Sequence, residues 1–234
     1  MAAINGRVPK GIFSQGKRVG GIAKNGAQVY KFPEKRYALR STGYQWIDLG
    51  IPIGLEYKPI RIVQKVKYSN KGTDYNIEGK TSTNRIYLGL GSNSTHWYIG
   101  AGAQQPLIAD NTIDFDTWYK MDYELTLGKR AILKINDVEK YNGAFTWATS
   151  GIVDGSIHLF AVANNTSVAN KSYQLKEFVQ IYIEDELYLD MVAVPEGNTD
   201  YSDIPAPSNC MWDKVNKRYF LNTGTRPFEI IEIT

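Results

Sequence analysis

The chain has 234 residues, of which 43% are hydrophobic and 22% are charged, and its formal net charge is +3. These proportions are typical of a soluble globular protein, while 16 tyrosines, 5 tryptophans and 21 glycines favour strands and turns. The sequence contains neither an apolar run long enough to span a membrane nor a secretory leader, so we expect synthesis in a cytoplasm and no membrane insertion.

The first 31 residues contain a short repeat with a period of ten. Glycines stand at positions 6, 16 and 26, each after Asn or Gln, which predicts short hairpins that turn at these glycines. A segment with so few apolar residues cannot bury a core of its own, so we expect it to be ordered against a partner chain. The alternative is a partly disordered tail.

Positive charge is concentrated in the same region. Residues 1–40 hold nine Lys or Arg against Glu34, a balance of +8, so the remaining residues carry −5. Such an asymmetry indicates a basic arm that docks on an acidic protein surface or on nucleic acid. We expect the docking residues to be Arg7, Lys10, Lys17, Arg18 and Lys24.

Pro33 and the charged residues after it predict a domain boundary, because proline interrupts strand pairing. Residues 1–33 would then form an anchoring segment and residues 34–234 a single β domain. In that domain no segment keeps a helical period over more than about ten residues. The predicted strands are residues 37–40, 44–49, 60–68, 76–80, 86–90, 97–100, 118–125, 131–135, 156–163, 175–184 and 186–195. Many short strands with long connections predict an all-β sandwich with Greek-key or jelly-roll wiring.

The clearest of these elements is a hairpin within residues 116–141. Its first strand alternates polar with apolar or aromatic residues, a Gly-containing turn follows at residues 126–130, and the chain returns over residues 131–135. An isolated hairpin is only marginally stable, so other strands must cover its apolar face. We therefore expect it to be scaffold, with four side chains in the core: Trp118, Met121, Leu133 and Ile135.

Three polar loops, residues 69–75, 92–96 and 164–171, are rich in side chains that can hydrogen-bond sugar hydroxyls, and aromatic residues lie beside them. The alternative is that these are ordinary turns, because Asn, Ser and Gly are the residues that turns require. The candidate glycan-binding residues are Tyr75, Asn93, His96, Trp97, Asn164 and Asn165.

Residue types that serve catalysis are present but poorly arranged. Glu184, Asp185 and Glu186 are consecutive at a predicted hairpin tip, whereas a glycosidase needs two carboxylates across one cleft. His158 alternates with apolar residues in a predicted strand, where we expect it to be packed, and His96 has no partner visible in the sequence. We therefore expect no catalytic residues and no enzyme activity.

Metal and cofactor sites are not expected either. A single cysteine and two histidines exclude an internal disulfide and a zinc site of the Cys/His type. Asp110, Asp114 and Asp116 are close in sequence, but calcium needs about 6–8 oxygen ligands, so a solvated loop is the better interpretation. The glycines at positions 6, 16 and 26 are not followed by a helix, as a phosphate-binding loop requires.

Three segments resemble parts of known phage proteins. Residues 211–228, MWDKVNKRYFLNTGTRPF, are similar to the segment that closes laminin-G-like, concanavalin A-type jelly rolls in structural and tail-associated bacteriophage proteins. Residues 116–118 and 131–137 resemble a hairpin of that fold, and residues 16–30 resemble N-terminal modules that attach appendage proteins to the virion. The resemblance implies an all-β, concanavalin A-like jelly-roll sandwich preceded by a small β-hairpin anchoring segment.

The leading hypothesis from this resemblance is a structural virion protein, such as a head fibre, capsid decoration or tail appendage, that binds other virion proteins through its first 33 residues. The alternative is a lectin-like module that binds host-surface glycans. A glycoside hydrolase is a third hypothesis and would require Glu184 or Glu186 to be catalytic. We expect the protein to be located in the virion and to form a homo-oligomer, with a trimer as one option, although no heptad repeat demands it.

Overall fold

The computed structural model describes residues 13–14, 17–18, 21–24, 27–31, 35–52, 58–69, 75–80, 85–90, 96–102, 107–109, 114–126, 129–144, 156–164, 167–169 and 173–233. Every regular element in these residues is a strand, and the pairs are antiparallel. Within the same residues there is no helix that is long and apolar enough to cross a membrane.

The larger of two packed sheets has ten strands. Eight of them follow the order β14 (Val138–Ala144), β13 (Arg130–Ile135), β12 (Trp118–Thr126), β7 (Ile60–Tyr68), β18 (Gln174–Ile183), β19 (Glu186–Val194), β20 (Cys210–Asp213) and β21 (Arg218–Phe220). The other two are β5 (Arg36–Arg40), which pairs with β18, and β22 (Glu229–Ile233), which pairs with β5.

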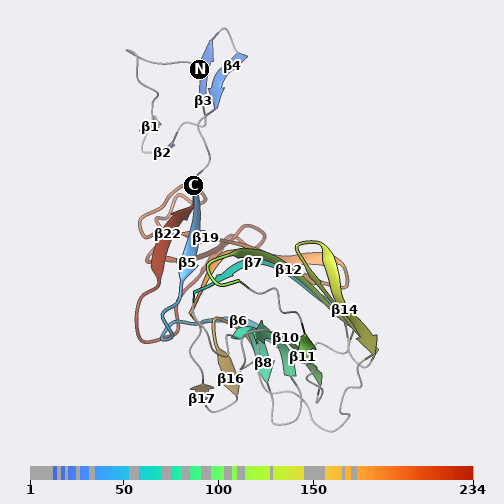
Figure 1. The fold of residues 1–234 in the computed structure, drawn as a ribbon. Coiled ribbons are helices and arrows are strands. Elements are labelled where there is room, and N and C mark those ends of the chain that lie inside the picture. Colours follow the sequence, from blue (N-terminus) through green and yellow to red (C-terminus); the bar gives the residue numbers. More distant parts are fainter. Residues whose placement is uncertain are drawn as a thin grey trace.

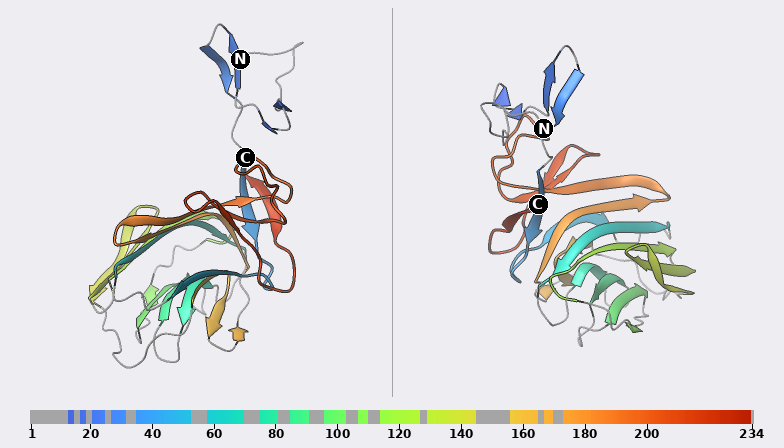
Figure 2. Two further views of the ribbon diagram at one scale, coloured as in Figure 1. Left: turned by 180° about the vertical axis from the view of Figure 1, so that it is seen from behind. Right: turned by 45° about the horizontal axis from the view of Figure 1, so that its top comes forward.

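The smaller sheet has six strands and lies beneath the curved larger sheet (Figures 1 and 2). Their order is β11 (Leu107–Ala109), β10 (His96–Gly102), β9 (Arg85–Leu90), β8 (Tyr75–Lys80), β15 (Ser156–Leu159) and β6 (Ile47–Pro52). The chain passes repeatedly between the sheets, since β5, β7, β12 and β18 belong to the larger sheet and β6, β8 and β15 to the smaller. The predicted all-β sandwich is therefore confirmed.

Strict alternation along β12 explains how the larger sheet covers the core. Tyr119, Met121, Tyr123 and Leu125 are buried, and the residues between them are half-buried or exposed. The predicted hairpin with β13 is confirmed, because Met121 pairs with Ile135 and Thr126 with Arg130. Each β12 residue that points inward therefore contributes to one continuous apolar layer.

The prediction that Trp118 lies in the core is wrong. Trp118 pairs with Lys67 on the outer face of the larger sheet, and the ammonium groups of Lys65 and Lys67 lie 5.4 and 5.7 Å from its ring centroid. The physical reason is its position in the alternation, since it stands two residues before the exposed Lys120 and shares the outer face with it. Met121, Leu133 and Ile135 are buried, as predicted.

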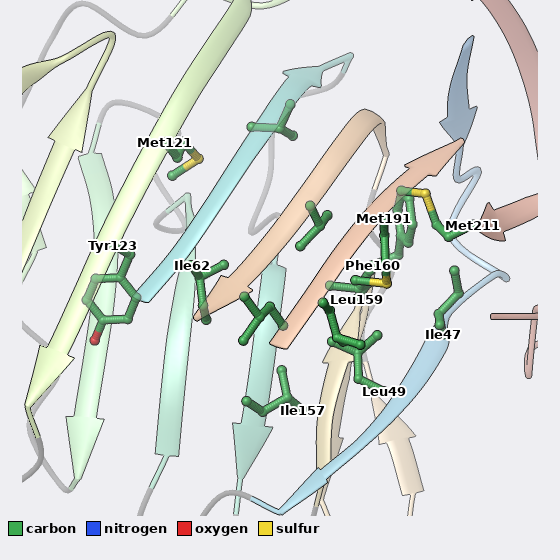
Figure 3. Packing of buried hydrophobic residues seen from close by; sticks show 14 of the residues in the cluster. Ile47, Leu49, Ile62, Met121, Tyr123, Ile157, Leu159, Phe160, Met191 and Met211 are labelled. Atoms are coloured by element: carbon green, nitrogen blue, oxygen red, sulfur yellow. The ribbon is translucent and has the colours of Figure 1, made fainter. Parts of the chain in front are cut away.

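The core lies between the two inner faces (Figure 3). The smaller sheet contributes Ile47, Leu49, Ile157 and Leu159, which are at most 2% exposed. The larger sheet contributes side chains of β7, β12, β19 and β20, among them Ile62, Met121, Tyr123, Met191 and Met211. Two interdigitated apolar faces of this kind hold a sandwich together.

Two predicted strands have clearly different boundaries, and the structure contains strands that were not predicted, β14 among them. The strand predicted at residues 156–163 is interrupted, because Phe160 adopts a left-handed backbone (φ 68°) and divides β15 from β16 (Val162–Asn164). The strand predicted at residues 44–49 begins only at Ile47, because the Tyr44 carbonyl accepts a hydrogen bond from Thr225 N instead of a sheet partner. The hairpin at residues 116–141 continues into a third strand, β14, at the edge of the sheet. Because the sequence of this strand is polar, it did not predict that β14 pairs with β13.

The residues before the sandwich form two small hairpins, β1 (Phe13–Ser14) with β2 (Lys17–Arg18) and β3 (Gly21–Lys24) with β4 (Ala27–Lys31). Their registers confirm the hairpins predicted at the second and third repeats, whereas residues 15–16 and 25–26 between the paired strands lie outside the described residues. The first repeat, with Arg7 and Lys10, lies outside the described residues. The division of the chain at residue 33 stays a prediction.

Residues 211–228 are the segment that resembles the end of concanavalin A-type jelly rolls, and they close the sandwich. The buried Asp213 carboxylate accepts hydrogen bonds from Val215 N (3.1 Å) and Asn216 N (3.2 Å), which stabilises the turn between β20 and β21. The Asn222 side chain accepts from Trp46 N (3.2 Å) and donates to the Arg226 carbonyl (2.6 Å), so it joins the closing segment to the start of β6. The motif therefore has a structural role.

Candidate functional site

The strand register brings several predicted glycan-binding residues to one end of the smaller sheet. Tyr75 begins β8 and His96 begins β10, next to Trp97. Asn164 is the last residue of β16. This strand comes directly after β15 in the chain, extends beyond the first residue of β8 and contacts β8. Asn93 and Asn165 lie outside the described residues. Tyr75, Asn164 and the neighbours His96 and Trp97 thus lie towards the same end of the smaller sheet, and the assignment of glycan binding to them stays a prediction.

A cross-strand row at this end runs through Tyr75, Gly89 and Tyr98. Adjacent strands are about 4.8 Å apart, so the two tyrosine positions are separated by about 10 Å with a glycine position between them. Ile99 is fully buried, so Tyr98 belongs to the outer face of the sheet. A glycine within a strand often marks a place that a ligand can approach closely.

Trp97 occupies a different face from this row. Trp97 and Ile99 are two residues apart in β10, so they share the face that packs on the core. Tyr98 is the aromatic position on the outer face; it is one of the aromatic residues beside the polar loops, but it was not among the candidate residues. The alternation within His96–Gly102 is the sequence signal that could have found it.

A second row crosses the outer face beside the first. His158 pairs with Asp48 on one side and with Glu78 on the other, and Glu78 pairs in turn with Tyr87, which pairs with Gly100. This row again places an aromatic position next to a glycine position. Sequence reasoning named His158 but missed Asp48 and Glu78, because the pairing of β15 with β8 and β6 joins segments that are about 80 and 110 residues apart.

The side chains around Asp48 form a polar group on the same face. The Ser156 hydroxyl and Gly50 N both donate to Oδ1 of Asp48, and Nε2 of His158 lies 3.8 Å from Oδ2. The Trp46 and His158 ring centroids are 5.3 Å apart, and His158 is only 8% exposed, so the prediction that it is packed is confirmed. The carboxylate separates the hydroxyl from the imidazole, so His158 is not placed to deprotonate Ser156. The half-exposed Asp48 carboxylate can accept hydrogen bonds from a ligand.

The acidic residues considered for catalysis lie at an exposed turn. Glu184 and Asp185 have left-handed backbones (φ 53° and 66°) and connect β18 with β19, as predicted. The Glu184 carboxylate pairs with Lys58 Nζ at 2.9 Å. Glycosidases place two carboxyl groups about 5–10 Å apart across a substrate cleft, and this hairpin tip does not have that form.

The backbone amides of two aspartates before β12 hold this loop in place. Asp114 N donates to the Tyr119 hydroxyl (2.7 Å) and Asp116 N donates to the Tyr68 carbonyl (2.7 Å), while Asp110 lies outside the described residues. Across the part of the chain that the structure describes, no three His, Cys, Asp or Glu residues gather in a way that could hold a metal ion.

Comparison with known proteins supports the fold. No family model and no curated protein matches the chain. A protein from Bacteroides ovatus to which carbohydrate binding is attributed is similar in structure, with 12% sequence identity and a TM-score of 0.57. The match covers 90% of this chain and 65% of that protein, so the chain spans slightly less than two thirds of its length.

Two further solved structures match with lower TM-scores. A heptameric SAP-like pentraxin from Limulus polyphemus has 13% identity over 85% of this chain and 88% of its own, with a TM-score of 0.48. Domains LG4–5 of the mouse laminin α1 chain have 10% identity over 64% of this chain and 42% of their own, with a TM-score of 0.44. The predicted concanavalin A-like jelly roll is confirmed.

Proposed function

We propose that this chain is a carbohydrate-binding module that recognises a glycan on the outer face of its smaller sheet. One observation carries the proposal, namely the row in which Tyr75 and Tyr98 lie on either side of Gly89. Tyrosine rings offer apolar faces for stacking and hydroxyls for hydrogen bonds, and a glycine between them leaves room for a sugar ring.

Polar groups beside this row complete the site. Asp48 and His158 lie in the adjacent row, and the Asp48 carboxylate is oriented by the Ser156 hydroxyl and Gly50 N. An oriented carboxylate discriminates among sugar hydroxyls at low entropic cost, because its geometry is already set before binding. The carbohydrate binding attributed to the structurally similar Bacteroides protein supports the same class of ligand.

A glycan array with the full chain tests the proposal. We expect binding to at least one glycan, and a loss of about tenfold in affinity for Tyr98→Ala or Tyr75→Ala, equivalent to about 1.4 kcal/mol. Trp118→Ala is the matched control, because it removes an aromatic side chain from the outer face of the other sheet. Trp97→Ala should instead lower the melting temperature, since position 97 belongs to the core side of β10.

Two results would contradict this function. One is a wild-type chain that is folded but binds no glycan on the array. The other is an equal loss of binding in Trp118→Ala and Tyr98→Ala, which would show that the larger sheet carries the activity or that aromatic truncation acts through stability.

A structural role in a virion is a second hypothesis. It is supported by the balance of +8 within residues 1–40 and by the small N-terminal hairpins, of which β2 carries Lys17 and Arg18 and β3 ends at Lys24. The two hypotheses are compatible, because an adhesion module can be displayed on a particle. Homo-oligomer formation and location in the virion belong to this second hypothesis.

A further inference from the structure

The larger sheet contains a fork at Glu177. β7 occupies one edge of β18 along its whole length, so the other edge is shared by two strands. β5 pairs with Leu175 and Lys176, whereas β19 pairs with β18 from Phe178 onward. The register of β18 with β7 also shifts between Lys176 and Phe178. Glu177 therefore stands at the point where β5 and β19 separate.

A pocket of about 160 Å³ lies at this fork. Its walls combine apolar and aromatic side chains from the three strands and from the loop after β19, among them Tyr37, Phe178, Val192 and Tyr201. Phe178 and Val192 form a cross-strand pair on the outer face of the sheet. The pocket therefore opens on the face opposite the core and on the other sheet from the site proposed above.

The polar groups of the pocket are held in ion pairs. The Glu177 carboxylate is 9% exposed, with Arg36 Nη1 3.0 Å from one oxygen and Lys65 Nζ 2.7 Å from the other. Lys35 pairs with Glu232 at 2.6 Å, and Lys214 pairs with Asp190 at 3.3 Å. The four cations face three carboxylates, since Arg36 and Lys65 share Glu177, so an excess of only one positive charge remains with which to select a free anion.

The pocket suits a small, neutral ligand with many hydroxyl groups. A volume of about 160 Å³ is below the roughly 300–1,000 Å³ of sites for drug-sized molecules, so it admits a single ring. Aromatic walls can stack on the ring, and the carboxylate and ammonium groups can accept from and donate to its hydroxyls. We propose that the fork pocket at Glu177 binds one neutral pyranose residue. This second site shares the ligand class of the proposed function but none of its residues.

Filling the pocket provides the test. Val192→Phe adds a ring to the pocket wall, while Ile132→Phe makes the same type of enlargement at a half-buried position on β13, away from the pocket. Saturation-transfer NMR and calorimetry with the full chain would use the methyl glycosides of glucose, galactose, mannose and N-acetylglucosamine. We expect at least one to bind with a Kd of about 1 mM, as is usual for a ligand of this size.

Val192→Phe should weaken that binding at least tenfold, while Ile132→Phe should leave it unchanged. If Val192→Phe does not fold, Glu177→Gln serves as the second variant, since it keeps the shape of the side chain, and we again expect at least a tenfold loss. The melting temperature of each variant, measured by thermal unfolding, shows whether a loss of glycoside binding is due to a loss of stability alone.

Several outcomes would overturn the second site. They are the absence of binding by all four glycosides to the folded wild-type chain, and undiminished binding in a folded Val192→Phe. Tighter binding of glucuronate or inorganic phosphate, with a strong dependence on salt, would identify an anion site instead. Loss of binding in Tyr98→Ala alone would assign the glycosides to the smaller sheet, which supports the proposed function and rejects this inference.

Discussion

Individual residues inside the sandwich show how a polar group is accommodated in an apolar core. Lys176 is fully buried, and its ammonium group donates to the Gln64 side-chain oxygen at 2.6 Å and lies 5.3 Å from the Phe160 ring centroid. A buried cation is tolerated only with polar or aromatic partners, because desolvation is costly. The pair also joins β18 to β7, so it favours one register of these neighbouring strands.

Cys210 provides a prediction about alkaline pH. It is buried in a small cluster with Val194, Ala206 and Trp212, and burial raises the pKa of its thiol from the ordinary 9.0 to about 12. The folded chain therefore keeps a proton that the unfolded chain releases at about pH 9. The stability that depends on this proton is complete below pH 9 and is lost as pH rises towards 12.

Urea denaturation followed by tryptophan fluorescence between pH 7 and pH 12 would measure this effect. We expect the free energy of unfolding to fall above pH 9, with a smaller fall in Cys210→Ala. Part of the decrease should persist in the variant, because burial also raises the pKa of Tyr123. Identical pH dependence in the wild-type chain and in Cys210→Ala would contradict the prediction.

At the scale of elements, the closing segment depends on a very close approach of two backbones. A Cβ atom at Gly224 would lie 2.0 Å from the Tyr44 carbonyl oxygen and 2.9 Å from Gln45 Cα. The guanidinium carbon of Arg226 lies 4.0 Å from the Tyr44 ring centroid, and the Gln45 side chain donates to the Pro227 carbonyl at 2.8 Å. The segment therefore docks as a unit on residues 44–46.

Gly224→Ala should destabilise the protein by about 3 kcal/mol, because backbone atoms must move to admit the methyl group. For a domain of this size the melting temperature should fall by about 6–12 °C. Gly197→Ala is the matched control, since Gly197 has a left-handed backbone (φ 74°) but open space around it, and should cost only about 1 kcal/mol. A similar decrease in melting temperature in both variants would contradict the prediction that the close approach of the backbones at Gly224 excludes a methyl group.

Alternation of residues predicted most of the strands but not their neighbours. The burial pattern of β12 and the turns at residues 184–185 and 214–217 follow from local sequence. The edge strand β14 was missed because Val138–Ala144 is polar and largely exposed, so it lacks the apolar period of an inner strand. The candidate glycan residues were chosen from loop composition, which cannot distinguish the two faces of a strand.

At the scale of the whole molecule, the two ends of the sandwich meet. Arg36 at the start of β5 pairs with Ile233 at the end of β22, so the first and the last strand of the sandwich lie side by side (Figure 1). In the part of the chain that the structure describes, β1 to β4 pair only with one another. The sandwich should therefore not require them for folding.

Deletion of residues 1–31 tests both this independence and the virion hypothesis. We expect a change of less than about 0.5 kcal/mol in stability and unchanged glycan binding, because no described sheet of the sandwich loses a strand. If the segment docks on a particle, the shortened chain should no longer be incorporated into virions. A variant with Lys17, Arg18 and Lys24 replaced by glutamine is the control for charge.

Normal incorporation of the shortened chain into particles would reject the docking role of the basic residues. A large loss of stability on deletion would show instead that the hairpins are part of the folded domain. Melting temperatures and particle composition together separate these results.

By itself, the sequence determined the class of fold, the local hairpins and the segment that closes the sandwich. These features depend on side-chain alternation and turn chemistry, which act over a few residues. Only the tertiary structure decided that β7 lies beside β18 and β8 beside β15, because contacts between segments about 80 to 120 residues apart depend on global packing. The row of Tyr75, Gly89 and Tyr98 and the fork at Glu177 are products of that pairing, so both proposed sites became visible only in the folded chain.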